Sequence, residues 1–200
     1  ENITMSLPPV EIPLGAMRFN SDFQTLEYFN GDVWMQVHTF SPTLEGGSRG
    51  LFGGGYTPTA TNRIDYITIE TAGNAADFGN LTQARRGSAA VSSATRGVVA
   101  GGRTPTIQNI IDYVTIASTG NAKDFGDIIG KAGECSSMQP AASPTRGVFA
   151  GGTGPTSQKG ISYITIASLG NDQDFGDLSS ATNGVGGCSN STRAIFRIRE

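Results

Sequence analysis

The sequence predicts an all-β protein built from repeats, and two observations carry this prediction. First, Gly accounts for 28 of the 200 residues, and Gly, Ser and Thr together make up about a third of the chain. Lys, a good helix former, occurs only three times, so the composition disfavours helices and suits short strands joined by tight turns. Second, a block with two strand-like segments recurs at a period close to 50 residues.

Charge and hydropathy exclude several partners. The net charge is −3, so no basic surface attracts nucleic acid. The apolar stretches are only a few residues long, whereas a membrane-spanning helix needs about 18–20, and no signal-peptide pattern is present. We therefore expect no nucleic-acid partner, no membrane insertion and no export signal.

Residues 1–45 form the first expected domain, an N-terminal arm and a small β-meander for attachment or oligomerisation. Three prolines within residues 1–13 indicate an extended arm, with a disordered tail as the alternative. Asn30-Gly31 is a signal for a hairpin turn. The expected strands cover residues 14–20, 26–29 and 33–37. Because a meander of this size is too small to be stable alone, we expect it to pack on the repeats or on another subunit.

Residues 46–200 form the second expected domain, which consists of repeats. Each full copy has an Arg, an apolar segment ending on a Gly pair, a Tyr-Ile/Val-Thr-Ile segment, a Gly-Asn pair and Asp-Phe-Gly. The Arg precedes the Phe by 29 residues in all three copies, and successive copies begin 47, 50 and 47 residues apart. The pairs are Arg49 and Phe78, Arg96 and Phe125, and Arg146 and Phe175, and a fourth copy begins at Arg193. The repeats cover about 46–92, 93–142 and 143–189, with a partial fourth in 190–200.

Each repeat is expected to form four short strands. The Tyr segment has apolar residues on both faces, which is typical of a strand packed between two sheets. Asp-Phe-Gly follows the Gly-Asn turn as a further strand, and small residues such as those in 86–94 form the weakest one. Pro58, Pro105 and Pro155 are expected in the loop after each Gly pair, where no sheet hydrogen bond is needed. We expect the three Phe side chains to be buried between neighbouring sheets.

Histidine and cysteine are too few for the common metal and catalytic sites. His38, Cys135 and Cys188 together fall short of a usual zinc site within one chain. A Ser-His-Asp triad would have to use His38, which lies in an apolar stretch and is expected as a strand residue. Both cysteines are expected as buried thiols, with a disulfide as the alternative. We therefore assign no catalytic, cofactor-binding or metal-ligating residues and no cofactor, and the binding residues stay unassigned.

The acidic residues are assigned to structure. Asp-Phe-Gly is a metal-binding signature of protein kinases, but here it recurs three times at the repeat spacing, without the other kinase motifs. Asp172, Asp174 and Asp177 could hold calcium if loops converged, and a solvated turn is the preferred interpretation. Asp65 and Asp112 recur with the repeat, which indicates turn chemistry.

These repeats resemble the kelch repeats of β-propellers. The shared pattern is an Arg, apolar residues before Gly-Gly, a Tyr strand and a closing aromatic, which is usually Trp in kelch repeats and is Phe here. The resemblance covers roughly residues 46–200 and implies three full kelch-like blades and a partial fourth. A β-trefoil-like fold is the alternative, since three four-stranded repeats also build that fold, although the period is long for it.

A second resemblance concerns the biological role. Residues 15–20 and 26–34 resemble a β-meander of tailed-bacteriophage virion proteins, and the repeats are similar to those of structural proteins of marine phages, including cyanophages. This implies a non-enzymatic virion protein of a tail fibre, tail tip or capsid decoration. Its role would be assembly with other virion proteins, or attachment to a host-surface glycan. The alternatives are a cellular lectin-like module and a glycan-degrading fibre enzyme, which needs two carboxylates about 5–10 Å apart.

The incomplete first and fourth copies predict association. Propellers have about four or more blades, and an open end exposes strand edges that natural proteins cover. Either these repeats are part of a longer propeller, or the final strands pair with another chain or with the N-terminal domain near residues 37–40. We expect a homo-oligomer, with the N-terminal domain and the final strand at or near the contacts.

Overall fold

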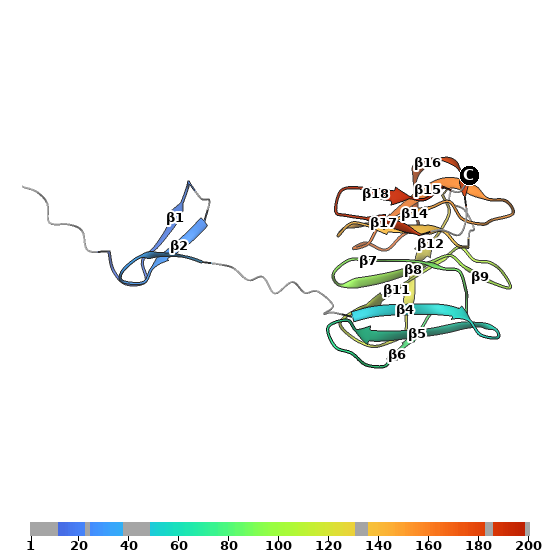
Figure 1. Cartoon of the computed structure of the whole chain (residues 1–200), viewed down its shortest axis with the longest axis horizontal. Helices are drawn as coiled ribbons and strands as arrows, with labels where there is room; N and C mark the ends of the chain where they lie inside the picture. Colours follow the sequence, from blue (N-terminus) through green and yellow to red (C-terminus); the bar gives the residue numbers. More distant parts are fainter. Residues whose placement is uncertain (1–11, 23–24, 38–48, 131–135, 183–185, 199–200) are drawn as a thin grey trace, which may run out of the picture. The chain divides into compact units, whose positions relative to one another are not determined.

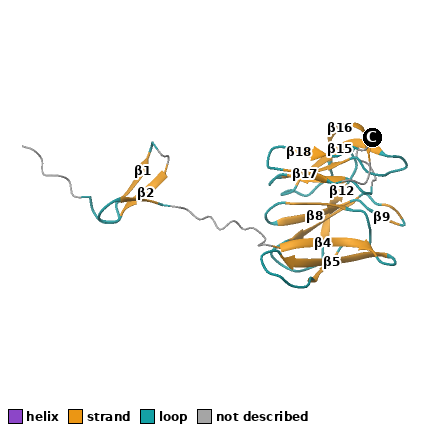
Figure 2. Ribbon diagram, in the orientation of Figure 1, coloured by secondary structure: helices purple, strands orange, loops and turns teal. Residues whose placement is uncertain are grey.

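The computed structural model consists, in the described residues, of strands, turns and loops (Figure 1, Figure 2). These residues are 12–22, 25–37, 49–130, 136–182 and 186–198. The predicted all-β class is confirmed, and the strands form several small antiparallel sheets, none of which closes into a barrel in this part of the chain. No helix that could span a membrane occurs in the described residues. The chain divides into two units, residues 1–43 and 44–200.

The N-terminal unit contains a three-stranded antiparallel meander at the segments predicted for it. Its strands are β1 (Met17–Asn20), β2 (Thr25–Phe29) and β3 (Trp34–Gln36). The side-chain oxygen of Asn30 accepts hydrogen bonds from the backbone N–H groups of Asp32 and Val33, which closes the predicted turn. On one face of the meander, the Arg18 guanidinium lies 4.2 Å from the centre of the Trp34 ring.

The second unit, residues 44–200, holds all the repeats, and we call it the repeat unit. It contains three sheets of one design, followed by a hairpin (Figure 1). Sheet 1 consists of β4 (Arg49–Tyr56), β5 (Ala60–Thr68) and β6 (Ala76–Asn80). Sheet 2 consists of β7 (Ala89–Ser92), β8 (Arg96–Ala100), β11 (Ile110–Thr115) and β12 (Lys123–Asp127). Sheet 3 consists of β13 (Gln139–Ala142), β14 (Arg146–Ala150), β15 (Gln158–Thr165) and β16 (Gln173–Thr182). Hairpin 4 consists of β17 (Gly187–Ser189) and β18 (Ala194–Phe196), and a small ribbon of β9 (Arg103–Thr104) and β10 (Thr106–Ile107) precedes β11.

Each four-stranded sheet begins before its Arg strand. The small-residue strand β7 pairs with β8, the Arg strand that follows it, and β13 pairs in the same way with β14. The sheets are therefore offset from the sequence repeats 46–92, 93–142 and 143–189. The physical reason is that a tight turn joins each small-residue strand to the next Arg strand, so these two strands meet as a hairpin.

The strand path is the same in every copy. Arg49, Arg96 and Arg146 each lie opposite a Thr of the Tyr strand. A bulge interrupts the pairing of the Tyr and Phe strands at the equivalent position of all three sheets. The turn before each Arg strand of sheets 2 and 3 is closed by a side chain that accepts the Arg backbone N–H, and Asn190 does the same in hairpin 4. The fourth copy therefore starts as these two do.

The sheets stack face to face, and equivalent residues form each interface (Figure 1). Between sheets 1 and 2 the buried apolar residues are Ile64, Phe78, Leu81 and Val114. Between sheets 2 and 3 the equivalent positions hold Ile111, Phe125, Ile128 and Ile164. Because these positions correspond at the periods of the sequence, one repeated interface builds the core of the repeat unit.

In each sheet the Arg, Tyr and Phe of the repeat stack on one another. The guanidinium carbon lies 4.9, 4.6 and 4.3 Å from the Tyr ring centre in sheets 1, 2 and 3. The Tyr and Phe rings meet nearly edge to face, with centres 5.9, 6.1 and 6.0 Å apart. Both contacts are attractive, because a cation and the edge of an aromatic ring are drawn to the negative face of another ring.

The expected burial holds for two of the three Phe side chains. Phe78 and Phe125 are each 3% exposed, because the following sheet covers them. Phe175 is 55% exposed, so the prediction is wrong there. Hairpin 4 packs on β13, and Phe196 adds to the core beside Val148, but this part of β16 stays open to solvent.

The Gly of Asp-Phe-Gly is required by the stacking of the sheets. Gly79 and Gly126 have φ angles of +147° and +149°, which favour glycine. A Cβ atom at either position would collide with the carbonyl oxygen of Gly120 or Gly170, in the Gly-Asn turn of the next sheet. The N–H of the same turn residue donates to the Phe carbonyl of the preceding sheet, at 2.8 and 2.9 Å. The motif is thus a docking point for the following sheet.

Phe125→Ala should lower the free energy of unfolding by about 3–5 kcal/mol, because it empties a closed space between two sheets. Phe175→Ala is the matched control and should cost less than half as much, since that ring is already half in water. Urea unfolding of both variants measures the difference. Equal losses would contradict the stacking described above.

Candidate binding surface

Three equivalent loops join each Arg strand to the Tyr strand that follows it. They comprise residues 54–60, 101–107 and 151–157 together with the strand ends and the β9–β10 ribbon inside these ranges, and we call them the Pro loops. Each contains the predicted proline, and each exposes a Pro-Thr pair. These pairs are Pro58 and Thr59, Pro105 and Thr106, and Pro155 and Thr156. The β4–β5 loop and the β9–β10 ribbon extend from the same side of the stack, so the loops are displayed together (Figure 1).

A Gly pair and a Gln side chain hold the second and third Pro loops in one shape. Gly101 and Gly102 have φ angles of +63° and +100°, and their equivalents have +61° and +115°. The backbone N–H of Gln108 donates to the Gly102 carbonyl at 2.8 Å, and its side-chain amide donates to the Thr106 carbonyl at 3.2 Å. Gln158 makes both bonds in the third loop, at 3.0 and 2.9 Å. The exposed Pro and Thr are therefore presented on a braced backbone.

The first Pro loop carries an exposed aromatic ring, and Thr61 stands where the other two have Gln. Tyr56 is 58% exposed, and the Arg86 guanidinium lies 4.1 Å from the centre of its ring. A Tyr side chain combines an apolar ring with a polar tip. Beside exposed threonines, such a ring can stack on the apolar face of a sugar.

The segment that contains Arg86 connects the first and second Pro loops. The N–H of Gly55 donates to the Arg85 carbonyl at 3.0 Å, on the side of the first loop. On the side of the second loop, Arg86 and Arg103 exchange backbone hydrogen bonds at 3.2 and 2.9 Å. Arg85 and Arg86 therefore set the spacing of the first and second Pro loops.

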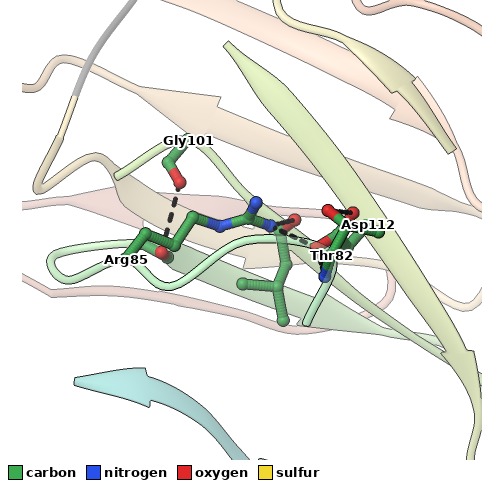
Figure 3. Close-up of polar contacts among 6 residues, drawn as sticks. Thr82, Arg85, Gly101 and Asp112 are labelled. Atoms are coloured by element: carbon green, nitrogen blue, oxygen red, sulfur yellow. Dashed lines mark hydrogen bonds and ion pairs between the residues drawn. The ribbon is translucent and has the colours of Figure 1, made fainter. Parts of the chain in front are cut away.

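Arg85 is anchored by a buried ion pair with Asp112 (Figure 3). Its Nη2 lies 2.9 Å from Oδ2 of Asp112, and both side chains are fully buried. The Asp112 carboxylate also accepts hydrogen bonds from the Thr82 backbone N–H at 3.0 Å and the Thr82 hydroxyl at 2.7 Å. The network fastens the segment after sheet 1 to strand β11 of sheet 2.

Burial lowers the pKa of the Arg85 guanidinium, and the Asp112 carboxylate opposes that shift. The assignment of Asp65 and Asp112 to turn chemistry is wrong, because they lie inside β5 and β11. Asp112 is also covered by Arg85 and Thr82. Its equivalent Asp65 forms a partly exposed pair with Arg63 at 2.6 Å. In the sequence, the signal for this site was Asp112, a charged residue within an otherwise apolar strand. Its partner Arg85 could not be identified from the sequence.

Sheet 3 anchors the preceding loop with a different carboxylate. Oδ1 of the buried Asp172 accepts the backbone N–H groups of Ile129 and Gly130, at 2.6 and 2.8 Å. Ser162 stands at the position of Asp112, and Asp172 stands at the position of Ala122. In sheet 3 the carboxylate therefore lies in the Gly-Asn turn and not in the Tyr strand, and it contacts the equivalent loop.

The remaining residues that were singled out in the sequence and that the structure describes form no metal-binding cluster. Asp174 and Asp177 lie in strand β16 and not in the expected solvated turn. Asp174 accepts the N–H of Gly176, and Asp177 faces Lys159 of β15 at 3.4 Å. In the described ranges no group of three or more His, Cys, Asp or Glu residues could hold a metal ion. Cys188 is an exposed free thiol, contrary to the expected burial, because hairpin 4 has only two strands. His38 and Cys135 lie outside the described residues.

A cavity of about 450 Å³ lies among the stacked sheets and hairpin 4. Its wall includes Leu51 of β4, Val91 of β7 and Ala141 of β13, and most of the other side chains are small or apolar. Among the described residues that line it, Asp112 is the only acid, and this acid is paired with Arg85. The described wall therefore brings no two carboxylates together.

No protein-family model matches the chain, and no curated protein sequence is significantly similar to it.

Arg85→Met should lower the free energy of unfolding by about 3–5 kcal/mol, because it leaves the Asp112 carboxylate buried without its cation. Arg63→Met is the matched control, since it breaks the pair that Asp65, the equivalent of Asp112, forms at the surface. Exposed pairs contribute little, so the control should unfold as the wild type does. Urea denaturation tests both variants, and similar losses would refute the role assigned to the buried pair.

Proposed function

We propose that this chain is a non-enzymatic structural protein of a tailed-bacteriophage virion, located in a tail fibre, a tail tip or a capsid decoration. In this proposal the three sheets are blades of a kelch-like β-propeller and hairpin 4 begins a further blade. The Pro loops contact host-surface glycans. The observation that carries the display role is the repetition of one braced, exposed loop in successive sheets. The virion location rests on the resemblance of the meander and the repeats to phage structural proteins.

The arrangement of the sheets supports a propeller. In propellers, four-stranded antiparallel sheets are repeated radially around a central channel. Here the first strands of successive sheets adjoin, since β7 contacts β13 and β13 contacts β17, as strands nearest a common axis do. A trefoil would place strands of different repeats in one barrel, whereas each described repeat sheet pairs only its own strands.

The Pro loops suit weak polar binding sites that act together. Threonine hydroxyls and backbone amides can form hydrogen bonds with a sugar, and the Tyr56 ring can stack on it. One loop offers few such groups. Because equivalent loops lie on adjacent sheets and on several copies, each further binding event becomes intramolecular, and avidity exceeds the affinity of one loop.

The N-terminal meander suits assembly, because many of its apolar side chains are exposed. These are Leu14, Met17, Phe19, Leu26, Tyr28, Val33 and Met35. Sheets of this size are marginally stable alone, and exposed apolar patches mark interaction sites. We therefore assign to the meander the contacts with other virion proteins and with other copies in a homo-oligomer.

The full-length chain, clustered on streptavidin through an N-terminal biotin, should bind surface polysaccharide extracted from marine bacteria. The unclustered chain should bind far more weakly, because it lacks multivalency. Replacing both Thr106 and Thr156 by Lys should weaken the binding of the clustered chain at least tenfold. Surface plasmon resonance on immobilised polysaccharide measures these differences.

The matched control replaces Thr95 and Thr145 by Lys, at the other end of β8 and β14, where both residues are also exposed. This variant should bind as the wild type does. No binding by the clustered chain, or equal loss in the control, would overturn the glycan-binding role of the Pro loops. Release of reducing ends from the polysaccharide would instead favour a glycan-degrading enzyme.

A further inference from the structure

Sheet 3 has an outer surface that the described chain leaves open to solvent. Phe175 is 55% exposed, although its two equivalents are almost fully buried. Arg146 is also exposed, and its guanidinium lies 4.3 Å from the centre of the Tyr163 ring. Gly176 has a φ angle of +144°, as its equivalents do, yet no atom lies near the position that its Cβ would take. We call the surface of Arg146, Tyr163, Phe175 and Gly176 the open face.

In sheets 1 and 2 the equivalent surface is covered by the outer hairpin of the following sheet. This hairpin consists of the Tyr strand, the Gly-Asn turn and the Phe strand. An Arg side chain secures it, since Arg49 donates to the Ile116 carbonyl at 2.8 Å and Arg96 donates to the Ile166 carbonyl at 2.7 Å. Arg146 is the equivalent donor on the open face.

The Gly-Asn turn adds backbone contacts to both covered sheets. The N–H of Gly120 or Gly170 donates to the Phe carbonyl of the preceding sheet, at 2.8 and 2.9 Å. The side-chain oxygen of Asn121 or Asn171 accepts the backbone N–H two residues after that Phe, at 3.0 and 2.9 Å. The open face presents the equivalent groups around Phe175, and the backbone of Gly176 already has the conformation that receives such a turn.

Hairpin 4 supplies the inner half of a further sheet and leaves an edge for the outer half. Strands β17 and β18 contact β13 as β13 and β14 contact β7. Both β8 and β14 pair with a Tyr strand on their outer edge. In the described chain β18 pairs with β17 only. A free strand edge beside an uncovered apolar face is a site for strand addition.

We infer that the open face and the free edge of β18 form a docking site for the outer hairpin of a further repeat of this design. The occupant carries a Tyr-Ile-Thr-Ile or Tyr-Val-Thr-Ile strand, a Gly-Asn turn and an Asp-Phe-Gly strand. The outer hairpins described in this chain are each paired within their own sheet, so none of them occupies this site. The two covered sheets define its contacts, which are the Arg-to-carbonyl bond, the bonds of the turn and burial of the Phe ring.

A fluorescent synthetic peptide of residues 108–130 is the probe, since it spans β11, the Gly-Asn turn and β12. Titrated with the full-length chain, it should bind saturably by fluorescence anisotropy. Phe175→Ala and Arg146→Ala should each weaken binding at least tenfold. A peptide with Ala in place of Gly120 and Asn121 should bind as weakly.

Phe52→Ala is the matched control, because Phe52 of sheet 1 is 59% exposed and lies outside the open face. This variant should bind the peptide as the wild type does. Urea unfolding verifies that all three protein variants are folded. Absence of saturable binding, or binding that Phe52→Ala removes and Phe175→Ala leaves unchanged, would overturn the proposal. This titration contains no polysaccharide. A failure of the peptide to bind would therefore not contradict the proposed glycan-binding role of the Pro loops.

Discussion

The contact between the Asp-Phe-Gly strand of one sheet and the Gly-Asn turn of the next sets the geometry of the repeat unit. The Phe ring fills the space between the sheets, and its carbonyl accepts the N–H of the turn. The Gly that follows removes the Cβ that would keep the two backbones apart. Because this contact recurs at the period of the sequence, each sheet places the next in the same way.

Buried carboxylates make directional hydrogen bonds across interfaces that are otherwise apolar. Asp112 and Asp172 approach the loop after the preceding sheet from different positions, and both bond its backbone. Burying a charge costs free energy unless it is paired and hydrogen-bonded. Between sheets 1 and 2, Arg85 pairs with Asp112 and offsets this cost. Because the Arg85 segment also joins the first two Pro loops, the buried ion pair sets the spacing of these loops as well.

Stacking also connects assembly to display. A sheet that is apolar on both faces is not stable alone, so each repeat depends on a neighbour to cover it. The same succession of sheets places one Pro loop after another on the same side of the stack. In the proposed virion role, a docked partner would cover the open face and would add further loops to the displayed set.

Periodic and local signals were enough to predict the all-β class, the strand segments, the loops at Pro58, Pro105 and Pro155, and the equivalence of the Arg, Tyr and Phe positions. These features depend on neighbours in the chain or on a constant spacing, so a single sequence contains them.

The burial of equivalent residues could not be predicted in this way. Phe78, Phe125 and Phe175 share one motif, but only a covering sheet excludes water from the ring, and the motif does not encode that sheet. Asp65 and Asp112 likewise share a position, and the choice between a partly exposed pair and a buried one depended on Arg85, which has no repeat-spaced signal. Tertiary structure therefore decided which equivalent residues form the core, which hold the Pro loops, and which stay exposed for a partner.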